Sequence, residues 1–388
     1  MVRVEEALQK ITSQEVPLET ATYAVFESLG YCLAETIYAP FDLPSFDNSA
    51  MDGYAICGSG TTFKLKGEVA AGDTGTYSLN EGEALRIFTG ARTPENTTAV
   101  IMQEHTRLEA NTVCLEKEYH AGQNVRKQGT ELAAGQEVFP IGHQLTPASI
   151  GLLSSLGFAS IKGYRQPRVH ILVTGDELVA PGAPLKPGQI YESNGATLAA
   201  VLQQFGIKAI AIYAIKDQLE ALSQQVVKSL KEADFILISG GISVGEYDFT
   251  KKALEQNGVE EVFYKVKQKP GKPLWFGKKA NRFVFALPGN PASALTCFYI
   301  YAWPLLQKFQ GLPATGLTRQ KVSITHNYKA NPERPEFLKA KIEQEKVTIL
   351  EGQSSSMIFS MALANALVFT GSLNEMRAGD EVECILIP

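Results

Sequence analysis

The chain has 388 residues, of which 45% are hydrophobic and 20% charged, and its formal net charge is -5. At roughly 150 residues per domain, this length indicates two or three domains with sizeable cores. The composition is ordinary for a soluble globular protein, and a net negative charge argues against a general nucleic-acid binder, which would usually be basic.

Nothing in the chain indicates secretion, a membrane span or a zinc site. The N-terminus, Met1 to Glu6, is charged and lacks the apolar core of a signal peptide, and the longest apolar run, residues 297–306, is broken by Pro304. The five cysteines are scattered, without a CxxC pair or a Cys/His cluster. We therefore predict a cytoplasmic protein that binds neither membrane nor nucleic acid.

The first part of the chain predicts helices that flank a β-rich insert. Residues 4–35 carry apolar side chains at helical spacing, and residues 145–158 return to it. Between them, short β-like runs at 62–65, 84–88, 99–102 and 112–115 alternate with turn-rich connections. This pattern predicts a discontinuous helical arm (1–40 and 141–166) and a β-rich insert (41–140).

Strands and helices alternate from residue 169 to about 312. Strand-like runs begin at residues 169, 207, 235 and 283, and helical patterns occupy 196–205, 219–233 and 249–256. Such alternation predicts a parallel, doubly wound sheet in an α/β domain, here residues 167–317. Short β runs at 321–325 and 382–387 predict a separate C-terminal β domain (318–388).

The most informative run is ISGGISVGEYD at residues 238–248, directly after the apolar stretch Phe235 to Leu237. It predicts a buried strand that stops at Gly240 and Gly241, turns, and enters a helix near Asp248. Two adjacent glycines lack Cβ atoms, so backbone N–H groups can closely approach an anionic or flat ligand. An acid just beyond such a loop suits a metal held against a phosphate, so we expect a phosphorylated ligand.

Three predicted strand ends carry acids: Asp176 and Glu177, Asp217, and Asp248. Ligands of open α/β sheets bind outside the carboxyl ends of the strands, so Asp176 or Glu177 should converge with Asp217 and Asp248 on one crevice. Mg²⁺ prefers one or two carboxylates plus phosphate oxygens, which this arrangement would supply.

Each acid also fits a structural role that the spacing leaves open. Asp217 followed by Glu220 resembles a capping box for the next helix, and both roles can hold at once. Asp248 fits a plain N-cap, and Gly175 with Asp176 fits an ordinary turn. It is the coincidence of three acids at equivalent strand ends that favours a site.

Lysines recur at period two at Lys265, Lys267 and Lys269, and Lys272 follows in the run KPGKP. The period predicts one face of a strand. Such a face either protects a sheet edge from pairing or forms a cationic wall for an oxyanion, and the Pro270–Gly271 turn favours Lys269 and Lys272 pointing inward.

The run LPGNPAS, residues 287–293, ends another apolar strand and opens a helix. Asn290 suits its N-cap and Pro291 its first turn, and a helix N-terminus offers free N–H groups to an anion. A well-made strand-to-helix turn explains this geometry equally, but not so many special residues in succession.

Seven segments, in order and spacing, resemble the molybdopterin molybdenumtransferase family (the MoeA and gephyrin E-domain proteins): FDNSAMDGYA, IFTGARTPE, NVRKQGTE, TGDEL, SGGISVGEYD, KPGKP and LPGNPAS. The resemblance covers nearly the whole chain. It implies a homodimer of four-part subunits, with a helical arm, a β insert, a molybdopterin-binding α/β domain and a C-terminal β-barrel. It also implies the reaction, in which molybdate enters the dithiolene of adenylylated molybdopterin and Mg²⁺-dependent cleavage releases AMP.

The resemblance also implies site residues. The positions that match catalytic ones are Asp52, Glu177, Asp217, Asp248, Lys265 and Lys269. Glu177, Asp217 and Asp248 are the candidates to hold Mg²⁺ or to position the attacking water. The positions implied to bind substrate are Thr89, Arg126, Gly240, Gly241, Ser243, Gly245, Lys272, Pro288, Asn290, Pro291 and Ser356. Lys267 matches no functional position. Asp52 and Thr89 lie in a different domain from the acids and are expected to complete the pocket of the partner subunit.

Three loop details depart from the family pattern. Glu131 stands where an aspartate is usual, Arg92 stands near a position that is often proline, and Ser354 to Ser356 replace a motif that contains more glycine. These departures concern loops and leave the central motifs intact.

Three other functions remain open on the sequence. One is the molybdopterin adenylyltransferase, whose family is roughly the α/β domain alone and which is also an expected pathway partner. Another is a non-catalytic gephyrin-like scaffold. The third is a nucleotide pyrophosphatase of the competence-damage type, in which the TGDEL-like motif stands near the N-terminus, whereas here it begins only at Thr174.

Overall fold

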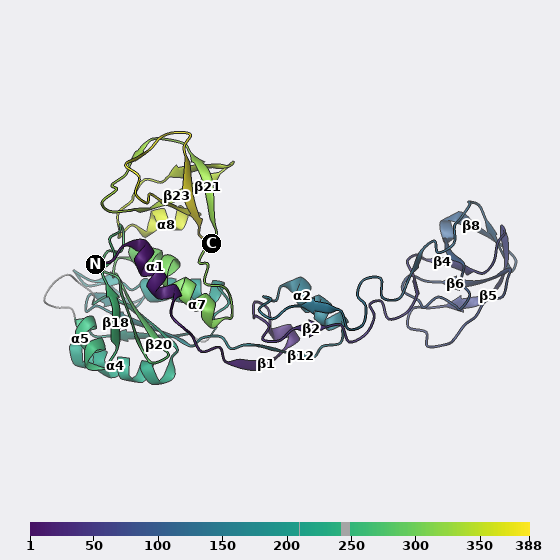
Figure 1. Cartoon of the computed structure of the whole chain (residues 1–388), viewed down its shortest axis with the longest axis horizontal. Coiled ribbons are helices and arrows are strands. Elements are labelled where there is room, and N and C mark those ends of the chain that lie inside the picture. The colour runs from purple at the N-terminus through teal and green to yellow at the C-terminus, as the bar shows by residue number, and fades with distance from the viewer. Residues whose placement is uncertain (209, 242–248) are drawn as a thin grey trace. The chain divides into compact units, whose positions relative to one another are not determined.

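The computed structural model describes residues 1–208, 210–241 and 249–388. They form two compact units, one of residues 1–34, 144–146 and 161–388 and the other of residues 35–143 and 147–160 (Figure 1). The predicted multidomain class, α/β plus β, is confirmed, while the residue boundaries predicted for four domains stay predictions. Within the described ranges, no helix is long and apolar enough to cross a membrane.

The first unit is built on a six-stranded sheet in the order β16-β13-β17-β20-β19-β18. Its strands are β13 (Val169–Thr174), β16 (Ile210–Ile215), β17 (Phe235–Ser239), β18 (Glu260–Tyr264), β19 (Trp275–Lys279) and β20 (Arg282–Leu287). β16, β13, β17 and β20 run parallel, and β19 and β18 extend the sheet in antiparallel fashion. The parallel sheet was predicted; the antiparallel pair at its edge was not.

Helices cover both faces of this sheet because its central strands are apolar on both sides. The helices concerned are α1 (Val4–Thr12), α3 (Asn194–Gln204), α4 (Leu219–Glu232), α5 (Phe249–Gln256), α6 (Pro291–Cys297) and α7 (Trp303–Phe309). Phe235 and Leu237 of β17 share a core with α1, α3, α6 and α7. Ile236 and Ile238 face the opposite way and pack with α4 and α5. This alternation makes the fold doubly wound (Figure 1).

The C-terminal strands close into a barrel in the order β21-β24-β23-β25-β27. They are β21 (Arg319–Ile324), β23 (Phe337–Glu343), β24 (Lys346–Ile349), β25 (Ala366–Phe369) and β27 (Glu381–Leu386), and α8 (Ile358–Leu363) lies between β24 and β25 in sequence. Leu338, Val347 and Val368 are among the residues of its core. The C-terminal β-barrel is thereby confirmed.

The second unit holds another six-stranded sheet, in the order β7-β4-β6-β5-β9-β8. Its strands are β4 (Gly53–Ile56), β5 (Thr62–Val69), β6 (Glu83–Ile87), β7 (Ala99–Met102), β8 (Thr106–Glu109) and β9 (Thr112–Leu115), and α2 (Pro147–Ser155) belongs to the same unit. Ala55 and Ile87 pack on one side of the sheet, and Ile56 and Ala84 on the other.

One predicted helical stretch is wrong. The apolar residues at Ala24, Val25 and Leu29 suggested a helix, but β1 (Thr20–Ala24) is a strand that runs into a short 3₁₀ turn at Val25–Glu27. β1 pairs with β12 (Ser160–Tyr164). Such long-range pairing overrides a local period that fits a helix only loosely.

Candidate functional site

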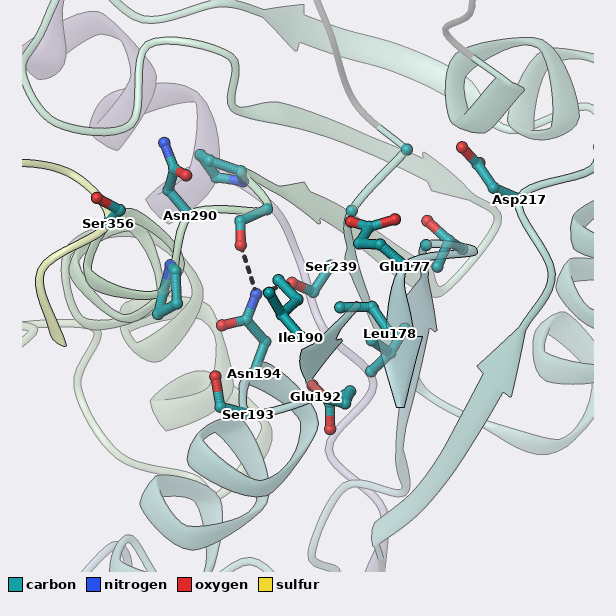
Figure 2. A pocket seen from close by; sticks show the side chains of 18 of the residues that line it. Glu177, Leu178, Ile190, Glu192, Ser193, Asn194, Asp217, Ser239, Asn290 and Ser356 are labelled. Atoms are coloured by element: carbon teal, nitrogen blue, oxygen red, sulfur yellow. Dashed lines mark hydrogen bonds between the residues drawn. The ribbon is translucent and has the colours of Figure 1, made fainter. Parts of the chain in front are cut away.

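A cavity of about 620 Å³ opens where the parallel strands end. Its lining comes from the ends of β13 and β17, the segments that follow β13, β16, β17 and β20, β15 (Ile190–Tyr191), the start of α3, Pro273 and one residue of the loop before α8. The predicted residues among its lining are Glu177, Asp217, Gly240, Gly241, Pro288, Asn290, Pro291 and Ser356. We call it the acidic cavity. Figure 2 shows Asp217 toward one end, and Asn290 and Ser356 toward the other.

Asp217 is an acid of this cavity with a buried oxygen. Its Oδ1 atom is buried and has no hydrogen-bond partner among the described residues. Its backbone N–H donates to Asp176 Oδ1 at 3.3 Å, which ties the end of β16 to the end of β13. Burial, followed by the negative charges of Asp176 and Glu177, raises the pKa of Asp217. A bound cation would offset all three effects.

The capping-box interpretation of Asp217 is wrong. α4 begins at Leu219, its N-cap is Gln218, and no side-chain hydrogen bond caps it. Since a capping box needs the N-cap side chain to accept from the first turn, Asp217 and Glu220 lie in the wrong register. The structural alternative therefore does not account for an acid at position 217.

The glycine pair is required by close packing against the neighbouring strand end. Gly240 and Gly241 have φ of +95° and +63°. A Cβ at position 240 would lie 2.2 Å from the carbonyl oxygen of Thr174, and one at 241 would lie 2.6 Å from Thr250 Oγ1. Both glycines line the acidic cavity, so the same pair that lets β17 turn beside β13 also keeps side chains out of it.

Asn194 is a site residue that the sequence reasoning missed. Its Nδ2 donates to Ser239 Oγ at 2.8 Å and to the Gly289 carbonyl at 2.7 Å, which joins the ends of β17 and β20 (Figure 2). Its Oδ1 is buried without a partner among the described residues, as is Thr174 Oγ1. The only signal in the sequence was a polar run, Glu192 to Asn194, that leads into a helix.

A second cavity, of about 330 Å³, shares Pro273, Pro288 and Asn290 with the first. Its charged lining residues are all cationic as far as the described chain extends: Lys269, Lys272 and Arg334. Ser293, Ser354 and Ser355 add hydroxyl groups. We call it the cationic cavity. The two cavities thus place carboxylates on one side and cations on the other side of a shared wall.

The predicted strand with three lysines on one face is wrong. β18 ends at Tyr264, and Lys265 has φ +66°, a left-handed conformation that breaks the extended backbone. Lys267 pairs with Glu333 at 2.9 Å and Lys269 with Glu336 at 2.8 Å. The Lys265 ammonium lies 4.6 Å from the centroid of the Tyr264 ring, and Lys265 is absent from the linings of both cavities.

The LPGNPAS segment makes the expected strand-to-helix turn, with one difference. β20 ends at Leu287, Asn290 is the N-cap and α6 begins at Pro291. The Asn290 side chain does not cap the helix. Instead its Nδ2 donates to Ser355 Oγ at 2.8 Å, which connects the α/β domain to the loop before α8 at the shared cavity wall.

In the second unit, the loops that carry the motifs FDNSAMDGYA, IFTGARTPE and NVRKQGTE contact one another. The backbone N–H and the Oγ1 of Thr89 both donate to Asp52 Oδ1 at 2.7 Å, and these bonds lower the pKa of Asp52. Arg126 pairs in register with Asn48, and Asn48 also bridges to Arg92. Asp52, Thr89 and Arg126 are exposed. Their functional roles stay predictions.

Ser243, Gly245 and Asp248 lie outside the described residues. In the part of the chain that is described, no group of three His, Cys, Asp or Glu side chains could hold a metal ion. The predicted Mg²⁺ ligand set includes Asp248, so it stays a prediction.

Three known families together match almost the whole chain. Residues 2–157 match the MoeA N-terminal region (domain I and II), residues 170–308 a probable molybdopterin binding domain, and residues 321–387 the MoeA C-terminal region (domain IV). A molybdopterin molybdenumtransferase of Haemophilus influenzae is 41% identical over 317 residues, 80% of this chain and 78% of that protein. One of Staphylococcus epidermidis is 31% identical over 400 residues, 99% of this chain and 95% of that protein. The chain belongs to the MoeA family of molybdopterin molybdenumtransferases.

Solved structures agree with this assignment. Two structures of the molybdopterin biosynthesis MoeA protein of Pyrococcus horikoshii resemble the chain with TM-scores of 0.82 and 0.84, at 31% and 26% identity. Each covers all of this chain, which spans 99% and 100% of those chains. As a MoeA family member the chain is an enzyme, a transferase, of molybdenum cofactor biosynthesis. An adenylyltransferase made of the α/β domain alone would not match the N-terminal and C-terminal MoeA regions.

Proposed function

We propose that this MoeA family member inserts molybdate into the dithiolene of adenylylated molybdopterin and cleaves the phosphoanhydride, with release of AMP. The observation that carries the proposal is the buried Oδ1 of Asp217, which lies beside Asp176 and Glu177 and has no hydrogen-bond partner in the part of the chain that the structure describes. The adjoining cationic cavity supports it, because the two substrates together bring a phosphoanhydride and a separate oxyanion.

The donor set fits Mg²⁺. Asp217 offers a carboxylate oxygen that the described protein leaves unsatisfied, Glu177 lines the same cavity, and Asp248 follows the glycine loop in sequence. Hard oxygen ligands of this kind, with phosphate oxygens, are what Mg²⁺ prefers. When bound, the ion would neutralise phosphoanhydride oxygens and make the phosphorus more open to attack.

Different side chains of the chain then have different roles in the reaction. Glu177 and Asp217 can accept hydrogen bonds from the water that attacks the phosphoanhydride and so orient it. Asn194 Oδ1, held by the two bonds of its amide nitrogen, can accept an N–H of the bound substrate. Lys269, Lys272 and Arg334 can stabilise the molybdate oxyanion, as preorganised charge does where negative charge accumulates.

The cluster of Asp52, Thr89 and Arg126 enters the proposal through dimerisation. These residues are exposed, and two hydrogen bonds from Thr89 fix the Asp52 carboxylate. We propose a homodimer in which this cluster completes the pocket of the other subunit. We further propose that the adenylyltransferase of the pathway supplies the substrate, in the cytoplasm.

The test is a purified assay with adenylylated molybdopterin, molybdate and Mg²⁺ that follows AMP release and formation of molybdenum cofactor. We expect wild-type protein to do both, and Asp248→Asn to abolish cofactor formation while the fold is retained. Undiminished turnover by Asp248→Asn would refute the role of that acid.

A second assay, supplied with ATP and molybdopterin instead, tests the other enzyme. Consumption of both to give the adenylylated form would favour an adenylyltransferase. Absence of molybdate insertion by the wild-type protein would favour a scaffold, and full insertion by the variant with both Asp217→Ala and Asp248→Ala would make the two acids incidental.

A further inference from the structure

Lys339 is a buried lysine that belongs to neither cavity. It lies on β23 and is 2% exposed. Its neighbours Leu338 and Ala340 point into the barrel core, whereas Lys339 and Phe337 share the opposite face, and Phe337 packs in the core of the α/β domain. Among the described residues, no carboxylate pairs with Lys339. A buried lysine without an acid is unusual.

Three carbonyl oxygens surround its ammonium group. Lys339 Nζ donates to the carbonyls of Gly352 at 2.6 Å, Ser354 at 3.0 Å and Met357 at 3.1 Å. A lysine ammonium has three N–H donors and no acceptor, so all its donors are satisfied by one short segment. We call this segment, residues 352–357, the serine loop.

The serine loop lines both cavities. Ser354 and Ser355 face the cationic cavity, and Ser356 faces the acidic one. The loop has no regular secondary structure, so its shape depends on such bonds. Gln353 supports it through two bonds to the Lys339 backbone, and Ser360 Oγ donates to the Gly352 carbonyl at 2.7 Å.

The direction of the carbonyls decides what the loop presents. In a trans peptide, the C=O and the following N–H point opposite ways. Because the Ser354 carbonyl points at Lys339, the N–H of Ser355 points away from it. Ser355 Oγ accepts from Asn290 at the shared wall of the cavities. Three carbonyls of the loop, those of Gly352, Ser354 and Met357, therefore turn toward Lys339, and the Ser355 N–H lies on the opposite side, where it can donate to an anion.

We propose that Lys339 is a positioning residue for the oxyanion substrate, which acts by holding the serine loop rather than by touching the ligand. Its uncompensated charge also adds positive potential to the cationic cavity, because charge is weakly screened where it is buried. The inference rests on the proposed function and names how the oxyanion part of that site is built.

The test compares Lys339→Met with Lys341→Met, a control on the same strand whose side chain is 47% exposed and pairs with Glu343. We expect Lys339→Met to raise the KM for molybdate at least tenfold, to change kcat less than threefold, and to speed hydrogen exchange in residues 352–357. Lys341→Met should match wild type in all three. Lys339→Arg, which keeps donors and charge, should restore the KM to within about threefold of wild type.

Folded Lys339→Met with wild-type KM and wild-type exchange would overturn the proposal. Should that variant not fold, Ser360→Ala decides, because Ser360 bonds two of the same carbonyls, those of Gly352 and Met357, from outside both cavities. We expect a smaller KM rise and faster exchange confined to the loop; no change in either would overturn the proposal.

Failure of the proposed function looks different. If wild type inserts no molybdate, that function fails, while hydrogen exchange and calorimetric binding of molybdate alone still test Lys339. If wild type inserts molybdate and Lys339→Met does so with unchanged KM, only the present inference fails.

Discussion

The two ends of the parallel sheet each carry an aspartate with a buried carboxylate oxygen, and the two have opposite surroundings. At the carboxyl end, Asp217 follows β16 with an oxygen that lacks a partner in the described protein. At the amino end, Asp234 directly precedes β17, and its side chain is 0% exposed. The same parallel sheet therefore has an aspartate at each end, and the two lie in contrasting surroundings.

Asp234 is fully satisfied by arginines. Arg165 donates to it at 2.8 Å, the Arg168 backbone N–H at 2.9 Å, and Arg282 forms a further short ion pair. Burial alone would raise the pKa of Asp234, but these hydrogen bonds hold it well below its usual range. Burial raises the pKa of Asp217, and the negative charges of Asp176 and Glu177 raise it further. A satisfied buried acid indicates stability, and an unsatisfied one in a cavity indicates function.

The largest expected effect is a loss of stability when Asp234, at the amino end of the parallel sheet, is replaced. Asp234→Ala leaves three arginines around an empty site, and breaking a buried ion pair costs about 3–5 kcal/mol of unfolding free energy. Urea denaturation measures it, with Glu109→Gln as the control, since the Arg107–Glu109 pair is exposed and should cost under about 1 kcal/mol. A loss below about 1 kcal/mol for Asp234→Ala would break the contrast between the two ends.

The next largest expected effect is a loss of activity when Asp217, at the carboxyl end of the parallel sheet, is replaced. Asp217→Asn should lower molybdate insertion by about 10²- to 10³-fold, the usual cost of losing one preorganised electrostatic group. Without added metal, its stability should equal or exceed that of wild type, because a charge that repels Asp176 and Glu177 is removed. AMP release in the presence of Mg²⁺ measures the activity, and urea denaturation in the presence of a chelator measures the stability without metal. A variant that is less stable yet fully active would reverse the assignment.

The pH dependence of stability sharpens the comparison. The pKa of Asp234 is depressed in the folded state, so its contribution is present above the unfolded pKa of about 3.9 and is lost as pH falls from there toward the lower folded value. Asp234→Asn should therefore lie below wild type at neutral pH and approach it below about pH 4. Denaturation curves measured from pH 7 to pH 3 give this difference directly; a constant difference would contradict the account.

The smallest effect separates two lysines of one run. Lys267 pairs with Glu333, whose side chain is 83% exposed, and lies outside both cavities. Lys267→Met should change neither activity nor stability by more than about 0.5 kcal/mol. Lys269→Met, in the cationic cavity, should raise the KM for molybdate. Equal effects of the two variants on KM would remove the distinction.

Strong local patterns were enough to predict the α/β core and much of the β structure. The run Phe235–Ser239 is apolar on both faces and the helix Phe249–Gln256 is amphipathic, so both form where the sequence places them. The C-terminal barrel was predicted from the family resemblance, because short β runs alone do not indicate whether their strands pair into a closed barrel.

Non-local contacts decided what the sequence could not predict. The lysine run has a strand period, but a left-handed Lys265 and pairing with Glu333 and Glu336 break it. The sequence pattern of Asp217 and Glu220 indicates a capping box. In the structure, however, the helix begins one residue later than that capping box would need. Asn194 is the first residue of α3 in a polar run, and only the meeting of the ends of β17 and β20 reveals its two bonds.

The most direct test of the central claim is a crystal structure of the protein soaked with Mg²⁺, AMP and molybdate. The account predicts the cation on Asp217 and Glu177, with AMP phosphate beside it, and molybdate among Lys269, Lys272 and the serine loop. A cation and anions bound elsewhere, with the Asp217 carboxylate still unengaged, would contradict it.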